Sequence, residues 1–387
     1  MTRATCHAVL GLGCVVAKPL LAEAAQWSVA PTFTWGVDTD SNRYLTYPAR
    51  ASQSTWLFTS WQLQHASETM QLSLSPTLRW QTFDVRQYGD IFDRILGGSL
   101  SWEHERWRLD MSGSVANEST LTTELTETGI ASNDLNRRTN SVSGTWTFSQ
   151  TERRSLVLQA AYTDTSYSGP QAGVSAYLVG YRYPNGFIGE QLQLTERDTL
   201  TPSAFYAALR SDIPQNDSRE TGGQVDWVHN FTERMRLDIA LGASDRSLAG
   251  TRSTGTVATV DFTRTSELGH VSFDYSRRLV PYGTGVLAQR TQYTLSVARN
   301  LSETFDVDAS LLRIENNKYT VLLRLDRPSY TGVTAGLNWR PLETLRLRLE
   351  ASGTDTQTLE IVGQQPLHEW RAALLLTWTP YPISRTF

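Results

Sequence analysis

The sequence of 387 residues predicts an all-β protein, a closed antiparallel up-and-down transmembrane β-barrel of about 18 strands. Three observations support this fold class. Apolar and polar residues alternate with period two along most of the chain, a short Ser/Thr-Glu motif recurs between the alternating segments, and the N-terminus resembles an export signal. Successive side chains of a strand point to opposite faces, so each segment presents one apolar and one polar face.

The N-terminal segment has the plan of a secretory signal peptide. Arg3 supplies a positive charge, residues 8–17 form a short apolar stretch, and Ala22-Glu23-Ala24 is a small-x-small cleavage site. We therefore expect residues 1–24 to be a cleavable signal peptide and residues 25–387 to be an outer-membrane barrel.

Composition excludes several protein classes. With 10% aromatic and only 19% charged residues, the chain is unlike a disordered protein. Beyond the N-terminus, no apolar run reaches the roughly 18–20 residues that a spanning helix needs. Both cysteines, Cys6 and Cys14, lie in the predicted signal peptide, so the mature chain cannot form disulfides or zinc–thiolate sites. The net charge of −4 gives no reason to expect nucleic acid as a partner.

The alternation is clearest in five segments, and none of them shows the i, i+3, i+4 spacing of an amphipathic helix. These segments are Met70–Trp80, Trp107–Val115, Met235–Gly242, Leu345–Ala351 and Trp370–Trp378. A soluble β-propeller or sandwich would also contain short strands. No four-strand blade repeat is visible, however, and the apolar faces stay apolar through mid-strand, which favours a barrel in lipid.

Eight tight turns are expected at one end of the barrel. Seven carry a Ser/Thr-Glu motif or a looser copy, marked by Glu68, Glu105, Glu152, Glu233, Glu267, Glu303 and Glu343; the eighth is Pro184-Asn185-Gly186. Longer polar connections are expected at Asn117–Arg138, Glu196–Arg219 and Gly353–Pro366. Eight turns with both chain ends on the same side give 18 strands. The number falls to 16 if one hairpin in the 186–218 or 254–275 region is instead a loop.

The alternating faces predict two sets of residues. An aromatic girdle at the short-turn end is expected to comprise Trp61, Trp102, Trp146, Phe148, Trp227, Phe231, Trp339 and Trp378. The lumen is expected to be lined by Arg79, Arg108, Asp110, Arg182, Asp226, Arg236, Asp238, Asp274, Arg278, Asp306, Asp308, Arg346, Arg348, Glu350 and Arg371. Ion pairs between arginines and carboxylates would stiffen the wall and set a transverse field across the lumen.

Catalysis is not expected, and neither is a metal or a cofactor. The sequence contains no Gly-x-Ser-x-Gly, His-Glu-x-x-His or Gly-rich phosphate loop. One weak constellation remains at the long-loop end, where His368 lies beside Glu369 and close in the predicted fold to Ser352. It keeps open the alternative of an outer-membrane lipid hydrolase.

The chain resembles outer-membrane barrels of the β-barrel porin 2 type, which are associated with capsular or exopolysaccharide and exosortase systems. The residues that carry the resemblance are Trp339-Arg340-Pro341, Trp378-Thr379-Pro380 and the turns that contain Leu301-Ser302-Glu303-Thr304 and Phe231-Thr232-Glu233-Arg234. The resemblance spans residues 26–387 and rests on short motifs. It implies a passage for an exported polysaccharide and periplasmic export components as partners.

Such barrels often end in an aromatic residue that the barrel-insertion machinery reads. Phe387 fits that pattern, although Pro380 and Pro382 interrupt the strand before it.

The sequence therefore predicts a porin-like channel in the outer membrane, surrounded by lipid, that passes small hydrophilic solutes or a polysaccharide. The alternative is a structural or adhesive barrel whose extracellular loops bind a partner.

Overall fold

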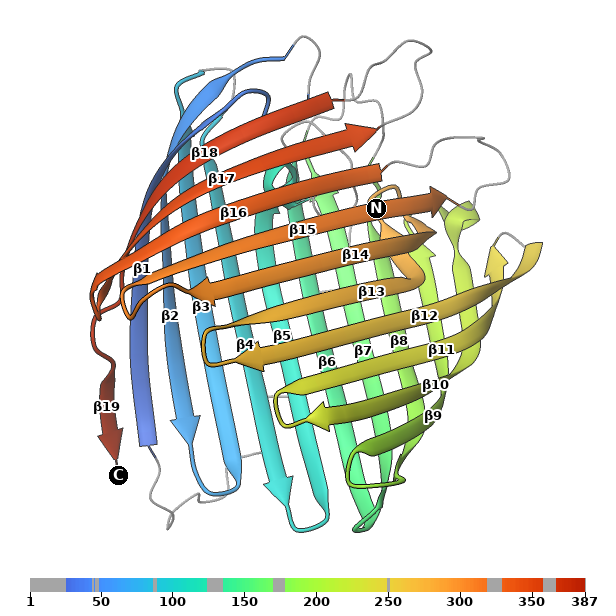
Figure 1. The fold of residues 1–387 in the computed structure, drawn as a ribbon. Coiled ribbons are helices and arrows are strands. Elements are labelled where there is room, and N and C mark those ends of the chain that lie inside the picture. The colour runs from blue at the N-terminus through green and yellow to red at the C-terminus, as the bar shows by residue number, and fades with distance from the viewer. Residues whose placement is uncertain are drawn as a thin grey trace.

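A computed structural model describes residues 26–43, 45, 49–85, 89–123, 135–169, 178–248, 251–318, 329–357 and 367–386. These residues form one antiparallel sheet that closes on itself, because β1 pairs with both β2 and β18 (Figure 1). The predicted fold class, a closed antiparallel barrel of 18 strands, is confirmed. The expected signal peptide and Phe387 lie outside the described residues. Among the described residues, no helix is long and apolar enough to cross a bilayer.

Each strand pairs with its neighbours in the sequence. The strands are β1 (Gln26–Asp40), β2 (Ser52–Ala66), β3 (Met70–Phe83), β4 (Ile91–His104), β5 (Trp107–Ser119), β6 (Asn136–Thr151), β7 (Arg154–Ser168), β8 (Tyr181–Gln193), β9 (Asp198–Ser211), β10 (Ser218–Thr232), β11 (Met235–Leu248), β12 (Thr251–Ser266), β13 (Gly269–Tyr282), β14 (Val286–Asn300), β15 (Phe305–Lys318), β16 (Ser329–Leu342), β17 (Leu345–Gln357) and β18 (Leu367–Trp378). A short segment, β19 (Ile383–Thr386), follows.

Short turns join the strands at one end, and their hydroxyl side chains explain the recurrent motif. Thr151 Oγ1 accepts a hydrogen bond from the backbone N–H of Arg153 at 3.3 Å, and Thr232 Oγ1 accepts one from Arg234 at 3.2 Å. This is the Ser/Thr turn, in which a side-chain oxygen satisfies a backbone donor that the bend leaves free. The seven turns predicted from the Glu positions all lie at this end of the barrel.

The eighth predicted turn is wrong. Pro184, Asn185 and Gly186 lie inside β8, where Asn185 is paired with Ala161 of β7. The actual connection between β8 and β9 is residues 194–197, whose Thr195-Glu196-Arg197 repeats the motif of the other turns. Pro184 is tolerated within the strand because the β8–β9 pairing is interrupted there: Arg182 pairs with Arg210 and Asn185 with Ala207, and residues 183 and 184 have no partner in β9.

The long connections are shorter than predicted, most of all between Glu196 and Arg219. The expected loop Glu196–Arg219 is mostly strand β9, followed by a single 3-10 turn at Pro214–Asn216. The other two expected loops are partly strand, because β5 continues to Ser119 and β17 continues to Gln357. Residues 186–218 and 254–275 both contain paired strands, which rules out 16 strands.

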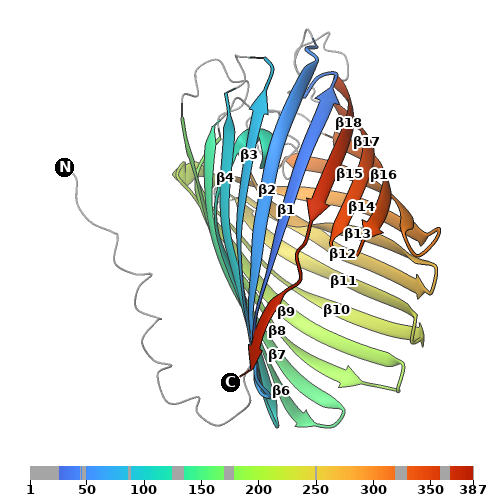
Figure 2. The same cartoon turned by 90° about the vertical axis from the view of Figure 1, so that its left-hand side faces the viewer.

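The first and last strands close the barrel. Eight residues of β1, Phe33 to Asp40, pair with β18, while its first four pair with β19. Pro380 and Pro382 end β18 as expected, but the chain then returns to the β1 edge instead of leaving it (Figure 2). The lower edge of β1 is thereby covered.

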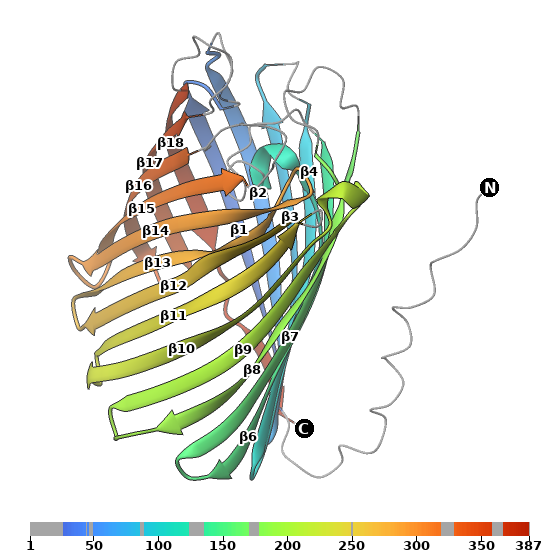
Figure 3. The ribbon, with the colours of Figure 1, turned by 90° about the vertical axis from the view of Figure 1, so that its right-hand side faces the viewer.

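The outer surface of the barrel is apolar. The exposed large side chains include Trp80 (48%), Leu96 (51%), Leu241 (61%) and Leu349 (57%), although the chain as a whole is only 40% hydrophobic. Strands of 12 to 16 residues exceed the roughly 9–11 that a tilted strand needs to cross a bilayer, and Figure 3 shows the oblique strands of the wall from β6 to β15. A closed barrel of this size with an apolar exterior belongs to the bacterial outer membrane. The predicted localisation is confirmed.

Candidate functional site: the lumen wall and its mouth

Strand register assigns each side chain to a face, because residues directly opposite each other on neighbouring strands point the same way. The face that carries the exposed apolar belt is outward, and the other faces the lumen. By this criterion, fourteen of the fifteen residues expected in the lumen lie on the inward face.

The exception is Arg182. It is paired with Asp164 of β7 and lies two residues from Pro184 and six from Ile188, which is 51% exposed in the apolar belt. Arg182 therefore points outward. The prediction failed because it placed a turn at residues 184–186, which removed the register that fixes the face of residue 182.

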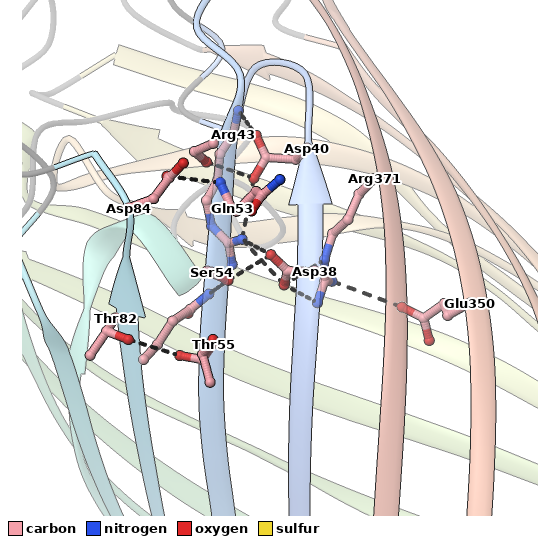
Figure 4. Close-up of polar contacts among 12 residues, drawn as sticks. Asp38, Asp40, Arg43, Gln53, Ser54, Thr55, Thr82, Asp84, Glu350 and Arg371 are labelled. Carbon is pink, nitrogen blue, oxygen red and sulfur yellow. Dashed lines mark hydrogen bonds and ion pairs between the residues drawn. The ribbon is translucent and has the colours of Figure 1, made fainter.

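One end of the lumen wall is organised around Asp38, which sequence reasoning did not select. Its carboxylate is fully buried and accepts hydrogen bonds from Ser54 Oγ at 2.6 Å, Arg43 Nη1 at 3.2 Å and Arg371 Nη2 at 2.8 Å (Figure 4). Asp40, two residues along, contacts the same Arg43 at 3.4 Å. The long-loop end of β1 is thus tied to both of its neighbouring strands.

Ion pairs continue from this point down the wall. Arg371 lies 3.8 Å from Glu350, which accepts a hydrogen bond of 2.9 Å from Arg348 Nε. Arg348 in turn donates from Nη2 to Asp308 Oδ2 at 2.8 Å. Charge-assisted bonds of this kind are the strong ones, and their planar fork fixes the geometry of the wall.

Asn338 connects these ion pairs to further charged residues toward the short-turn end of the barrel. It is fully buried, and its Nδ2 donates to Asp306 at 2.6 Å and to Asp308 at 2.8 Å, while its Oδ1 accepts from Arg346 at 3.0 Å and from Arg348 at 3.2 Å. A side-chain amide has two N–H donors and an oxygen with two acceptor sites, so Asn338 can serve two carboxylates and two guanidinium groups at once. Sequence reasoning missed it because it sought charges alone. The signal that was available in the sequence is that Asn338 precedes Trp339, an expected outward residue, and must therefore point inward.

We call this connected series the charge ladder. It runs from the long-loop end of β1 across β18, β17 and β16 to β15 near the short turns. Its members are Asp38, Asp40, Arg43, Arg371, Glu350, Arg348, Asp308, Asn338, Arg346, Asp306 and Arg340.

Two further ion pairs lie on other parts of the inward face. Arg79 of β3 contacts Asp93 of β4, and Arg108 donates from Nε to Asp110 at 2.8 Å on β5. The Arg79–Asp93 pair joins neighbouring strands near the mouth. Asp93 also accepts a bond from the backbone of Ser119 at 2.8 Å.

Acidic residues gather on another part of the wall. Asp238, Asp261 and Asp274 are directly opposite one another on β11, β12 and β13, and Asp226 lies on β10. Arg236 approaches Asp238 at 3.3 Å. This wall therefore has an excess of negative charge, whereas the charge ladder is nearly balanced.

Hydroxyl groups occupy the middle of the wall from β3 to β6, between the Arg79–Asp93 and Arg108–Asp110 pairs. Its inward residues form hydroxyl pairs across strands: Ser73–Ser99 at 2.8 Å, Ser112–Ser143 at 2.7 Å and Ser114–Ser141 at 2.8 Å. These small side chains border a groove in the wall. One side of the lumen is thus charged and another side carries hydroxyl groups.

The mouth is narrowed by the hairpin between β13 and β14. Its tip makes a bend in which Gly285 adopts φ of 71° and donates to the Tyr282 carbonyl at 2.8 Å. Tyr282, Val286 and Ala288 are buried against Leu135 and Leu178, and the Gly283 carbonyl accepts from Val179 at 2.8 Å. Residues 178–179 lead into β8, five strands away, so the hairpin folds inward to meet that part of the wall.

All eight residues of the expected aromatic girdle lie on the outward face at the short-turn end. They pack in pairs, such as Trp146 with Phe148 at 5.6 Å between ring centroids, and Trp339 with Phe305 at 6.0 Å. A second outward aromatic level, which the sequence analysis did not select, lies toward the long-loop end and comprises Trp80, Phe92, Tyr162, Tyr206 and Trp370.

The hydrolase constellation is not assembled. His368 is paired with Asp355 and lies on the outward face beside Trp370, whereas Ser352 is paired with Arg371 and points into the lumen. The two side chains lie on opposite faces of the sheet, so they cannot act together. Among the described residues, no cluster of His, Cys, Asp and Glu could hold a metal ion.

No protein-family model matches the chain, and no curated protein matches it in sequence. Solved structures do match. Pseudomonas aeruginosa OpdQ is 10% identical, with 93% of this chain covered, 98% of that chain and a TM-score of 0.45. P. aeruginosa OccK5 (OpdH) is 11% identical (92% and 98% covered, TM-score 0.48), and Acinetobacter baumannii OccAB3 is 9% identical (93% and 99% covered, TM-score 0.47). Likenesses at this distance do not bear on what the chain does.

Proposed function

We propose that this barrel is a passive outer-membrane channel for small hydrophilic solutes. The observation that supports the proposal is the charge ladder, which lines the inward face from the mouth to the short-turn end. Barrels of 16 to 18 strands are wide enough to hold an aqueous channel. Diffusion through it would be limited by size at the mouth and by the field of the wall, without an energy source or cofactor.

Charge is distributed unevenly around the lumen, and this distribution sets the electric field that a solute meets. Arginines and carboxylates of the charge ladder line the wall from β15 to β1, hydroxyl groups line the middle of the wall from β3 to β6, and β10 to β13 add an excess of acidic charge. A solute with both a charged group and hydroxyl groups could contact both walls at once. The excess of carboxylates on β10 to β13 should favour cations over anions of equal size.

An exported polysaccharide is the other solute class that the sequence resemblance implies, with periplasmic export components as partners. The β13–β14 hairpin favours small solutes instead. A sugar chain would have to pass the buried contact of Tyr282 with Leu135 and Leu178 or displace it. Displacement of well-packed side chains costs energy at every passage.

Planar-bilayer recording tests the proposal. Steady openings on the nanosiemens scale, together with liposome swelling in monosaccharides but not in long oligosaccharides, would support a channel for small solutes. Swelling in long oligosaccharides would instead support polysaccharide passage. A silent bilayer would contradict both and favour a structural or adhesive barrel whose loops bind an outside partner.

We also propose that the C-terminal residues, with Phe387, are read by the barrel-insertion machinery. The support is the position of β19, which pairs with β1 at the seam. A Phe387→Ala variant should then reach the outer membrane in reduced amount. Equal amounts of the two proteins in isolated outer membranes would contradict this role.

A further inference from the structure

Three arginines gather on the outward face of the barrel at the long-loop end. Arg182 of β8 is directly opposite Arg210 of β9, and Arg219 of β10 is opposite Ala208, which places it diagonally from Arg210. All three side chains are exposed. We call them the rim cluster. Directly opposed residues have Cβ atoms about 4.5–5.5 Å apart and diagonal ones about 7–8 Å, so one ligand can reach all three.

The rim cluster lies at the upper boundary of the apolar belt. Pro184, two residues from Arg182, is opposite Tyr162, and Tyr206 lies four residues from Arg210. Tyr162 and Tyr206 are 40% and 46% exposed on the outward face. Aromatic side chains at this height mark the membrane–water interface, and longer loops mark the cell exterior. The guanidinium groups therefore lie at the level of the headgroups of the outer leaflet.

No carboxylate lies within ion-pair distance of the rim cluster in the part of the chain that the structure describes. None of its three arginines makes an ion pair there, although Asp164 is opposite Arg182 in register and Asp245 lies near Arg219 on β11. Like charges directly opposite each other destabilise a sheet. The arrangement of Arg182 and Arg210 is therefore unfavourable without an anion between them.

The short-turn end of the barrel is different. There, outward Arg154 lies 3.0 Å from Glu190, and Arg234 lies 3.4 Å from Glu267. These two arginines are thus balanced by carboxylates of the chain itself. The absence of such balance at the rim cluster indicates that the anion comes from outside the protein.

We propose that the rim cluster binds the phosphate groups of a phosphorylated glycolipid in the outer leaflet. The forked guanidinium group matches phosphate geometry and remains charged at every relevant pH. The position of the cluster, on the lipid-facing side and directly above the belt, selects a lipid headgroup over a solute in the lumen. Basic residues near a membrane surface are attracted to anionic lipid headgroups.

Native mass spectrometry of the full-length protein in detergent tests this inference, with diphosphorylated lipid A and its dephosphorylated form as probes. We expect the wild type to retain the diphosphorylated lipid at least about tenfold better than the dephosphorylated one. The triple variant Arg182→Gln, Arg210→Gln, Arg219→Gln should lose that preference. Arg182→Gln alone should weaken it, which keeps the test valid if the triple variant does not fold.

Arg264→Gln is the matched control, because Arg264 is an exposed outward arginine at the short-turn end of β12 without an ion pair among the described residues. It should retain the lipid like the wild type. Equal retention of both lipid forms by the wild type, or equal loss in the control, would overturn the inference. Release of the lipid by millimolar inorganic phosphate would show a site for free anions and would overturn the assignment to lipid.

Discussion

Arg348 reaches Asp308 across an intervening strand. Arg348 is on β17 and Asp308 on β15, and between them β16 presents Gly336, which is opposite both Asp308 and Glu350. A Cβ atom at position 336 would collide with the guanidinium group of Arg348. The absence of a side chain on Gly336 therefore allows a charge-assisted bond of 2.8 Å between two strands that are not neighbours.

Gly336→Ala should break this bond. The new methyl group would displace the guanidinium from Asp308, and we expect the free energy of unfolding to fall by about 1–2 kcal/mol, in line with the loss of a partly exposed charged hydrogen bond. Denaturant unfolding in lipid vesicles would measure the change. Gly97→Ala is the control, since its Cβ would lie 3.8 Å from the nearest atom, the Ser75 carbonyl oxygen. Equal stability of wild type and Gly336→Ala would contradict the role of the glycine.

Removing the charge of Arg348 should change ion selectivity. Arg348→Gln leaves Asp308 and Glu350 with less positive charge nearby, so we expect the ratio of cation to anion permeability to rise about twofold in 0.1 M salt and less in 1 M salt, where screening is stronger. The reversal potential across a bilayer with a salt gradient reports this ratio. Arg313→Gln, on the outward face of β15, should leave the ratio unchanged. A similar shift in both variants would mean that the ladder does not face the permeating ions.

Loosening the hairpin at the mouth should increase conductance. Gly285 has a positive φ of 71°, and a Cβ there would lie 2.5 Å from Ser211 Oγ and 2.9 Å from Val179 Cγ1. Gly285→Ala should therefore strain the tip by about 1–3 kcal/mol and weaken its contact with residues 178–179. Single-channel recording should show a larger or noisier open state. An unchanged conductance would show that the described hairpin does not limit the passage.

The fold could be predicted from the sequence because its main signals are local. Alternation fixes the face of each segment, and a hydroxyl followed by Glu marks six of the eight tight turns. The inward positions of the lumen residues could be predicted from this alternation wherever the predicted strand boundaries were right. Arg182 failed because one misplaced turn removes the register of a whole hairpin.

Other parts of the site depend on contacts between distant residues. Asn338 gains its role only from Asp306 and Asp308 on β15 and from arginines on β17. The contact of the β13–β14 hairpin with residue 179 joins segments about a hundred positions apart in the sequence. Neither contact produces a periodic pattern in the amino-acid sequence, so neither could be predicted from it.

The turn that the sequence analysis missed provides a sharp test of why the motif recurs. Thr195 Oγ1 accepts from the backbone N–H groups of Arg197 at 3.1 Å and Asp198 at 2.9 Å, and donates to the Asp198 carboxylate at 2.7 Å. Thr195→Val keeps the shape but removes the hydroxyl, so we expect a loss of about 0.5–1.5 kcal/mol in unfolding free energy. Thr195→Ser should retain most of the stability because the oxygen remains. If Thr195→Ser proved as destabilised as Thr195→Val, the methyl group rather than the hydroxyl would hold the turn, and the hydrogen-bond explanation of the repeated motif would fail.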